Sequence, residues 1–236
     1  CNTAALCDAA ATSLAPGAIG SEDTWGIFSV ARITNESTGA TVYNSGDDGK
    51  YLTGVFYGLT DELVYSGALG NTQSTLAYSN GGSLKLWENT AEYDPTGGPS
   101  DRDGIDGYAG ISDIGGTLLL EAAFAGDVDL NEPGYTYLST FNEGTFAGSG
   151  QGFLDVVDGL WKDLLDTDGL TDTAGNSRDL FLDVTFNDVD QAGSSLGWTV
   201  LSTGSVKAEV VPVPAPLALL GLGLVGLAGM RRRKTV

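Results

Sequence analysis

Two glycine-containing loops hold the aspartates that are best suited to chemistry in this sequence. The two sets are Asp101, Asp103 and Asp106, and Asp166, Asp168 and Asp172. Calcium takes about six to eight oxygen ligands at about 2.3–2.6 Å, which closely spaced carboxylates in a bent loop can supply. Neither set has the spacing of an EF-hand, which ends on a glutamate at its twelfth position. Two interpretations stay open: one or both loops bind Ca²⁺, or aspartate and glycine simply form acidic turns.

Histidine is absent, which excludes several kinds of catalytic and metal site. Ser-His-Asp and Cys-His catalysis, histidine-ligated zinc or haem, and an imidazole switch all need that residue. Paired carboxylates can hydrolyse glycosides without histidine. With 31 acidic residues, however, some pair always falls at a suitable separation, so we expect no catalytic site and keep a glycoside hydrolase as a lesser alternative.

The charge of the chain excludes nucleic acid as a partner and differs sharply between its two ends. The 31 acidic and 11 basic residues give a net charge of −20, so binding would begin with repulsion from phosphates. All 31 acidic residues lie at or before Glu209, together with only seven basic ones, which is a net charge of −24. The other four basic residues close the chain: Arg231, Arg232, Arg233 and Lys234.

The two cysteines, Cys1 and Cys7, lie at the start of the sequence. The chain opens on Cys1 rather than on methionine, and we expect that an export signal peptide preceded it. An oxidising compartment would allow a disulfide between the two thiols. Plain thiols, or lipidation of Cys1, are the alternatives, whereas zinc binding by two cysteines alone is implausible.

The C-terminal segment has three parts in a fixed order. Prolines prevent a helix in the first part, which consists of Val211, Pro212, Val213, Pro214 and Ala215. An apolar run follows and extends to Met230. Counted from Ala215, these 16 residues would span about 24 Å as a helix, short of the ~30 Å hydrocarbon core, so the membrane anchor is marginal. The four cations after Met230 act as a stop and place the C-terminus in the cytoplasm.

This order of proline motif, short apolar helix and basic cluster resembles the PEP-CTERM sorting signal of Gram-negative bacteria. Val-Pro-Val-Pro-Ala is similar to the Val-Pro-Leu-Pro-Ala variant of that signal, with Val213 in place of leucine and no glutamate between the prolines. The resemblance implies that an exosortase, a membrane-embedded protease, processes this chain. It also implies an exported protein at the cell surface or in the extracellular polysaccharide matrix, held in the inner membrane as a precursor.

The body of the chain reads as an all-β domain. Short alternating runs separated by Gly, Asn, Asp and Ser predict a single β-sandwich or jelly roll over residues 21–210, between a loose segment 1–20 and the sorting signal 211–236. The predicted strands are Trp25–Ile33, Thr41–Tyr43, Tyr51–Tyr57, Glu62–Tyr65, Ser83–Trp87, Thr117–Ala125, Tyr135–Phe141, Asp179–Phe186 and Leu196–Val210. Phe153–Leu165 fits either a helix or a strand to Val157 followed by a short helix.

The stretch from Gly148 to Trp198 also resembles the last third of many PEP-CTERM surface proteins, which supports the sandwich. The leading hypothesis is therefore an exported structural or interaction protein. A carbohydrate-binding module or adhesin with calcium-ordered loops is the alternative. Its sugar-stacking face would come from one of two aromatic groups, either Tyr51, Phe56 and Tyr57 or Tyr135 and Tyr137, although packing in the core is the favoured interpretation of both groups.

Overall fold

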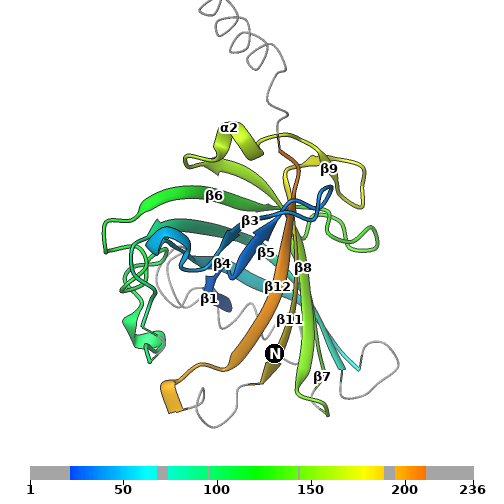
Figure 1. Cartoon of the computed structure of the whole chain (residues 1–236). Helices are drawn as coiled ribbons and strands as arrows, with labels where there is room; N and C mark the ends of the chain where they lie inside the picture. The colour runs from blue at the N-terminus through cyan, green and yellow to red at the C-terminus, as the bar shows by residue number, and fades with distance from the viewer. Residues whose placement is uncertain (1–21, 68–73, 95, 143, 189–194, 211–236) are drawn as a thin grey trace, which may run out of the picture.

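The computed structural model describes residues 22–67, 74–94, 96–142, 144–188 and 195–210. Within these ranges the chain folds into antiparallel β-structure, which confirms the all-β prediction. One eight-stranded sheet dominates (Figure 1). Its strands are β1 (Thr24–Ser29), β4 (Tyr51–Ser66), β5 (Ser74–Asn89), β6 (Thr117–Ala125), β7 (Tyr137–Asn142), β8 (Ala147–Asp158), β11 (Leu180–Asp188) and β12 (Val200–Ala208).

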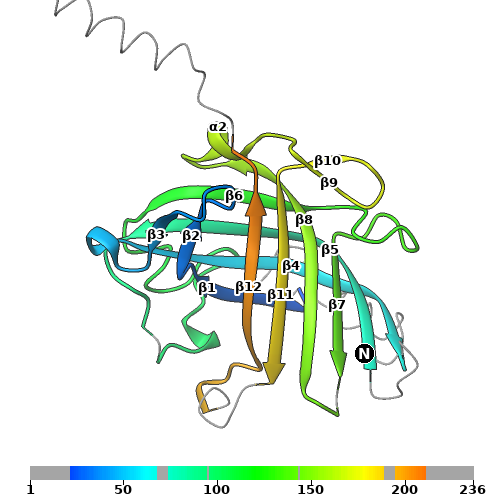
Figure 2. The same ribbon diagram turned by 45° about the vertical axis from the view of Figure 1, so that its right-hand side comes forward.

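The sheet follows the order β1-β4-β5-β6-β8-β11-β12, and β7 shares the place of β6 between β5 and β8. The first half of β5 pairs with β7, and its second half pairs with β6. Between these halves β5 passes through Gly81 and Gly82, whose φ angles of 71° and 94° favour glycine. The second half of β5 and strand β6 consequently run crosswise to β7, β11 and β12 (Figure 2).

The main hydrophobic core lies on one face of this bent sheet. It includes Leu59, Leu84, Ala122, Leu154 and Leu180, all buried. Alternation along each strand sends these side chains inward and their neighbours outward. The Gly148-x-Gly150-x-Gly152 pattern belongs to this packing. The rings of Phe186, Tyr137 and Phe124 occupy the space where side chains at the three glycines would lie.

A second, smaller cluster lies against the other face of β4. Val55, Tyr108 and Ile111 are its buried members, and Trp25, Trp87 and Trp198 pack around them. Tyr108 and Ile111 belong to the long connection between β5 and β6. That connection therefore covers the part of the sheet that the main core leaves open.

The smaller elements lie in the connections between the strands of the main sheet. They are β2 (Arg32–Thr34), β3 (Thr41–Asn44), β9 (Leu170–Thr171), β10 (Ser177–Arg178), α2 (Lys162–Leu165) and the 3-10 turns Asp47–Gly49 and Pro99–Asp101. Among the described residues no helix is long and apolar enough to cross a membrane.

Most predicted strands have counterparts, and β6 has the predicted bounds. Phe153–Leu165 is a strand to Asp158 followed by α2, so the continuous helix is wrong. Tyr51–Tyr57 and Glu62–Tyr65 are one strand rather than two. Gly58, with φ of 79°, and a register shift between Asp61 and Leu63 let β4 bend without ending.

Candidate functional site

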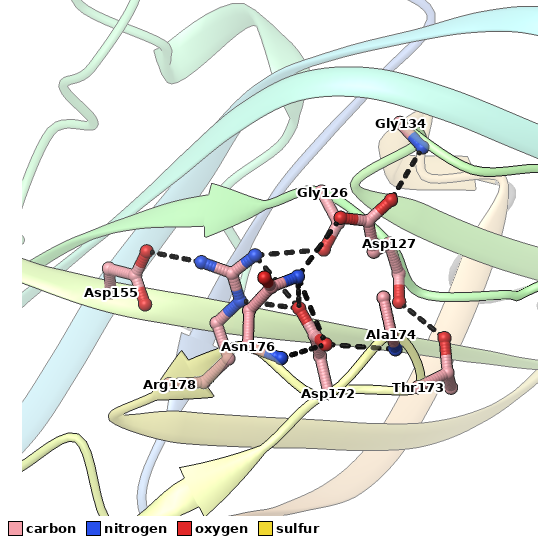
Figure 3. A network of polar contacts seen from close by, with 9 residues as sticks. All are labelled: Gly126, Asp127, Gly134, Asp155, Asp172, Thr173, Ala174, Asn176 and Arg178. Atoms are coloured by element: carbon pink, nitrogen blue, oxygen red, sulfur yellow. Dashed lines mark hydrogen bonds and ion pairs between the residues drawn. The ribbon is translucent and has the colours of Figure 1, made fainter.

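Arg178 is the centre of a polar network that includes one of the predicted calcium ligands (Figure 3). The short hairpin β9–β10 places this arginine beside Asp172, which begins the turn of the hairpin. Its Nη2 lies 2.8 Å from Asp172 Oδ2, and its Nη1 lies 3.0 Å from Asp155 Oδ2 on β8. One guanidinium therefore joins the hairpin to the main sheet through two carboxylates.

The Asp172 carboxylate is buried and fully occupied by hydrogen-bond donors. Its Oδ1 accepts the backbone N–H groups of Ala174 and Asn176 at 2.9 and 2.8 Å. Its Oδ2 accepts Arg178 Nε at 2.9 Å and Asn176 Nδ2 at 3.0 Å. Burial by itself would raise the pKa of Asp172, but the hydrogen bonds from Asn176 and Arg178 outweigh burial, and the pKa is lowered. The Arg178 guanidinium thus occupies the position beside this carboxylate that a bound metal ion would need.

Two further aspartates extend the network. Burial raises the pKa of Asp155, and the nearby Arg178 charge opposes that shift. Asp127, which has a positive φ of 65°, accepts Gly134 N through Oδ1 and Asn176 Nδ2 through Oδ2. These bonds connect the loop after β6 to the turn of the β9–β10 hairpin (Figure 3). The network therefore holds together three segments of the chain: β8, the loop after β6 and the β9–β10 hairpin.

The other two aspartates of this loop also have structural roles. Asp166 Oδ2 accepts Lys162 Nζ at 2.8 Å, one turn away. Asp168 takes part through its backbone, since its N–H donates to Asp179 Oδ1 at 2.8 Å. Asp179 is buried and also accepts the N–H groups of Thr167 and Val156, each at 2.8 Å. This carboxylate, which the sequence did not single out, fixes the loop to β8.

The first aspartate loop is bound to the sheet by Asp106. Its Oδ2 accepts Lys85 Nζ of β5 at 2.7 Å, and this bond lowers the pKa of Asp106. Asp101 Oδ2 accepts Gly98 N at 3.0 Å within the 3-10 turn. Asp103 takes part through its backbone N–H, which donates to Gly107 O at 3.1 Å. The three predicted ligands thus make separate bonds, Asp101 and Asp106 through their side chains and Asp103 through its backbone.

A buried ion pair also holds this loop in place. Arg102 pairs with Glu22, and both side chains are almost entirely buried. The guanidinium lies 4.2 Å from the ring centroid of Trp25, which stacks in turn near Trp198. Arg102 Nη1 donates to Glu22 Oε1 and its Nη2 donates to Ile105 O, whereas Glu22 Oε2 and Arg102 Nε have no hydrogen-bond partner. The sequence gives no local signal for this long-range contact.

The described residues contain no group of three or more acidic, histidine or cysteine side chains placed to hold a metal ion. Calcium binding at either loop stays a prediction. At Asp172 the ion would have to displace Arg178 and the amide donors, and at Asp106 it would compete with Lys85. Three predicted features lie outside the described residues: the disulfide between Cys1 and Cys7, the proline motif (Val211–Ala215) and the basic cluster (Arg231–Lys234).

The aromatic side chains proposed for sugar stacking do not share one surface. Phe56 packs on the main core, whereas Tyr57 packs on the second cluster across the sheet. Tyr137 is buried beside Phe124, while Tyr135 lies 5.4 Å from Tyr78, measured between ring centroids. Neither predicted group therefore forms an aromatic platform.

A flat polar surface instead crosses four strands on the face away from the core. Neighbouring strands place four hydroxyl side chains side by side in one row: Thr140, Ser149, Thr185 and Thr203. Thr140 and Ser149 are hydrogen-bonded at 2.9 Å, and Thr185 and Thr203 at 3.3 Å. Asp183 and Ser205 form the adjacent pair, and an open depression lies between β11 and β12. We call this set of residues the hydroxyl face.

No protein-family model, curated protein or solved structure that was searched matches this chain.

Proposed function

We propose that this chain is an exported surface or extracellular-matrix protein. Its C-terminal segment is a sorting signal processed by an exosortase-type membrane protease, and its β-domain is a non-catalytic interaction module. The observation that carries the proposal is the order of the proline motif at Val211–Ala215, the apolar run and the basic cluster Arg231–Lys234. This segment begins soon after β12, the last strand of the domain.

The charges support this topology. The part of the chain up to Glu209 carries a net charge of −24, whereas the last six residues contain four cations and no anion. Cations that follow an apolar segment stay on the cytoplasmic side, so the acidic domain is placed on the other side. An apolar run of about 24 Å is a weak anchor in a ~30 Å core, which suits a precursor that is held only until it is cut.

The bonding of the acidic residues supports a role without catalysis. Asp106, Asp172 and Asp179 all use their carboxylates to fasten loops to the sheet. We infer that the two crosswise halves of the sheet serve as the layers of the predicted sandwich, with their loops held rigid by these bonds. A rigid domain with a large exposed surface is suited to contacts with other macromolecules.

Substitutions in the proline motif test the sorting signal. The Pro212→Ala/Pro214→Ala variant should accumulate as unprocessed precursor in the inner membrane, and so should a variant that lacks 231–234. Pro133→Ala, at an exposed position in the domain, is the matched control and should be processed normally. Release of the double variant at the rate of the control, measured by immunoblotting of cell fractions, would contradict the proposal.

Binding of a neutral glycan is a second candidate function, because the hydroxyl face offers the groups that hydrogen-bond to sugar hydroxyls. Asp183 and Thr185 are exposed there, on the strand beside Thr203. The acidic domain would repel anionic polysaccharides, which leaves neutral ones. Affinity electrophoresis in dextran, starch and xylan should show retardation that Asp183→Asn and Thr185→Val reduce and Thr171→Val, on β9, does not. Equal mobility with and without each polysaccharide would exclude this function for those glycans.

A further inference from the structure

Strand β12 forms an open edge of the main sheet. In the described part of the chain it pairs only with β11, through nine consecutive residue pairs without a register shift. All nine of its residues are exposed. Leu201 is 68% exposed and Val206 is 51% exposed, on opposite faces of the strand. Such an edge presents unpaired backbone groups that can extend the sheet.

The contact between β11 and β12 shows which backbone groups face outward. Thr185 Oγ1 on β11 donates to the backbone oxygen of Thr203 at 3.3 Å, so the peptide groups of Thr203 face β11. Along a strand successive residues alternate in this respect. The N–H and C=O groups that face the free edge therefore belong to Val200, Ser202, Gly204, Val206 and Ala208.

This edge lacks the features that usually prevent strand addition. It has no proline, no bulge and no carboxylate, and Lys207 is its single charged residue. The opposite edge of the sheet differs. Strand β1 has six residues, a register shift after Thr24, and the buried Arg102 stacked on Trp25. Of these two edges, β12 is the one suited to pairing.

We propose that β12 pairs antiparallel with β12 of a second copy of this chain, about a twofold axis at Gly204. This proposal goes beyond the sorting function and does not depend on processing of the C-terminal segment. Full overlap of the nine residues places Val200 opposite Ala208 of the second copy, and Ser202 opposite Val206. Every outward backbone group then meets a partner, because even-numbered residues pair with even-numbered residues.

The side chains are compatible with this register. Thr203 would lie opposite Ser205 of the second copy, which continues the hydroxyl face across the interface. Leu201 would lie opposite Lys207, whose aliphatic stem can cover it. Like charges never lie opposite each other, since β12 has one cation and no anion. In a domain of net charge −24, an edge strand that is free of carboxylates and exposed along its whole length is where two copies can approach.

Sedimentation velocity of the full chain in mild detergent tests the pairing. The chain should form a dimer whose Kd falls with added NaCl, because salt screens repulsion between the acidic domains. Ser202→Pro removes an outward N–H without removing a bond to β11, and Val206→Lys adds a charge at the interface. Each should raise the dimer Kd at least tenfold. Val42→Lys, at a site 69% exposed on β3, is the matched control and should leave the Kd unchanged.

The outcomes separate this proposal from association through the apolar segment. A wild-type monomer, or a dimer that Ser202→Pro and Val206→Lys leave intact while their circular dichroism is unchanged, would overturn it. Cross-linking tests the register in a Cys1→Ser/Cys7→Ser background. Oxidising a mixture of Thr203→Cys and Ser205→Cys chains should give mainly the mixed disulfide, because opposite residues lie about 4.5–5.5 Å apart. Homodimers of Thr203→Cys as the main product would contradict the register.

Discussion

Replacing Asp179 by asparagine tests how the loop after α2 is held to the sheet. The native carboxylate accepts Thr167 N and Asp168 N through Oδ1 and Val156 N through Oδ2, each at 2.8 Å. Asparagine has the same shape but only one acceptor oxygen. If that oxygen keeps the two loop bonds, the new NH₂ group faces the Val156 N–H, and a buried donor loses its partner.

The magnitude follows from the loss of one bond to a charged acceptor in a buried site. Such a loss destabilises by about 2–3 kcal/mol, and removal of the buried charge offsets part of it. For a domain of this size, about 2–4 °C of melting temperature corresponds to 1 kcal/mol, so the lost bond alone would lower the melting temperature by about 4–12 °C, and the offset reduces this decrease. Asp179→Ala leaves three N–H groups unpaired and should destabilise more.

Urea unfolding followed by tryptophan fluorescence gives the free energy of unfolding for each variant. Asp163→Asn, at an exposed aspartate of α2, is the matched control and should change stability by less than about 0.5 kcal/mol. An Asp179→Asn protein as stable as that control would refute the reasoning. It would mean that the buried charge is as unfavourable as its three bonds are favourable.

Three other predictions use the same assays. Burial raises the pKa of Asp61, so the ionised carboxylate destabilises the fold at neutral pH. Asp61→Asn should therefore stabilise the protein at pH 7 but not at pH 3, where the carboxyl group is protonated in both the folded and the unfolded state. A gain in stability that persists at pH 3 would contradict this cause. Arg178→Met should destabilise by about 3–5 kcal/mol by leaving the buried Asp172 carboxylate without an opposite charge, and adding Asp172→Asn should recover part of that loss; additive effects in this double-mutant cycle would disprove the coupling. Millimolar Ca²⁺ should raise the melting temperature more than Mg²⁺ or NaCl of equal ionic strength, and a triple Asp→Asn variant of a binding loop should lose the difference; no loss in either triple variant would refute calcium binding there.

Local sequence located most of the strands, but it gave neither all of their bounds nor their arrangement. Alternation of apolar residues and the turn residues around it located β6 over Thr117–Ala125, and β3 within one residue. The order of the strands depends on contacts between distant parts of the chain, such as β5 with both β6 and β7. Gly58 looked like the end of a strand, yet β4 continues through it because the sheet bends there.

The aspartate loops were visible in the sequence, whereas their partners were not. Asp172 meets Arg178 only six residues away, but Arg178 also bonds to Asp155 on β8 and to Gly126 O after β6, 23 and 52 positions earlier. Asp179 receives its donors from residues 11, 12 and 23 positions earlier. Lys85 and Asp106 meet across the connection between β5 and β6. No local spacing rule predicts such pairs.

The measurement that tests the central claim most directly is the intact mass of the native protein, recovered from the cell surface and from the medium. The proposal predicts a mature chain cut at or near the proline motif Val211–Ala215, without the apolar run and without Arg231–Lys234. A native protein whose mass includes every residue to Val236, and which stays in the inner membrane, would contradict the sorting function.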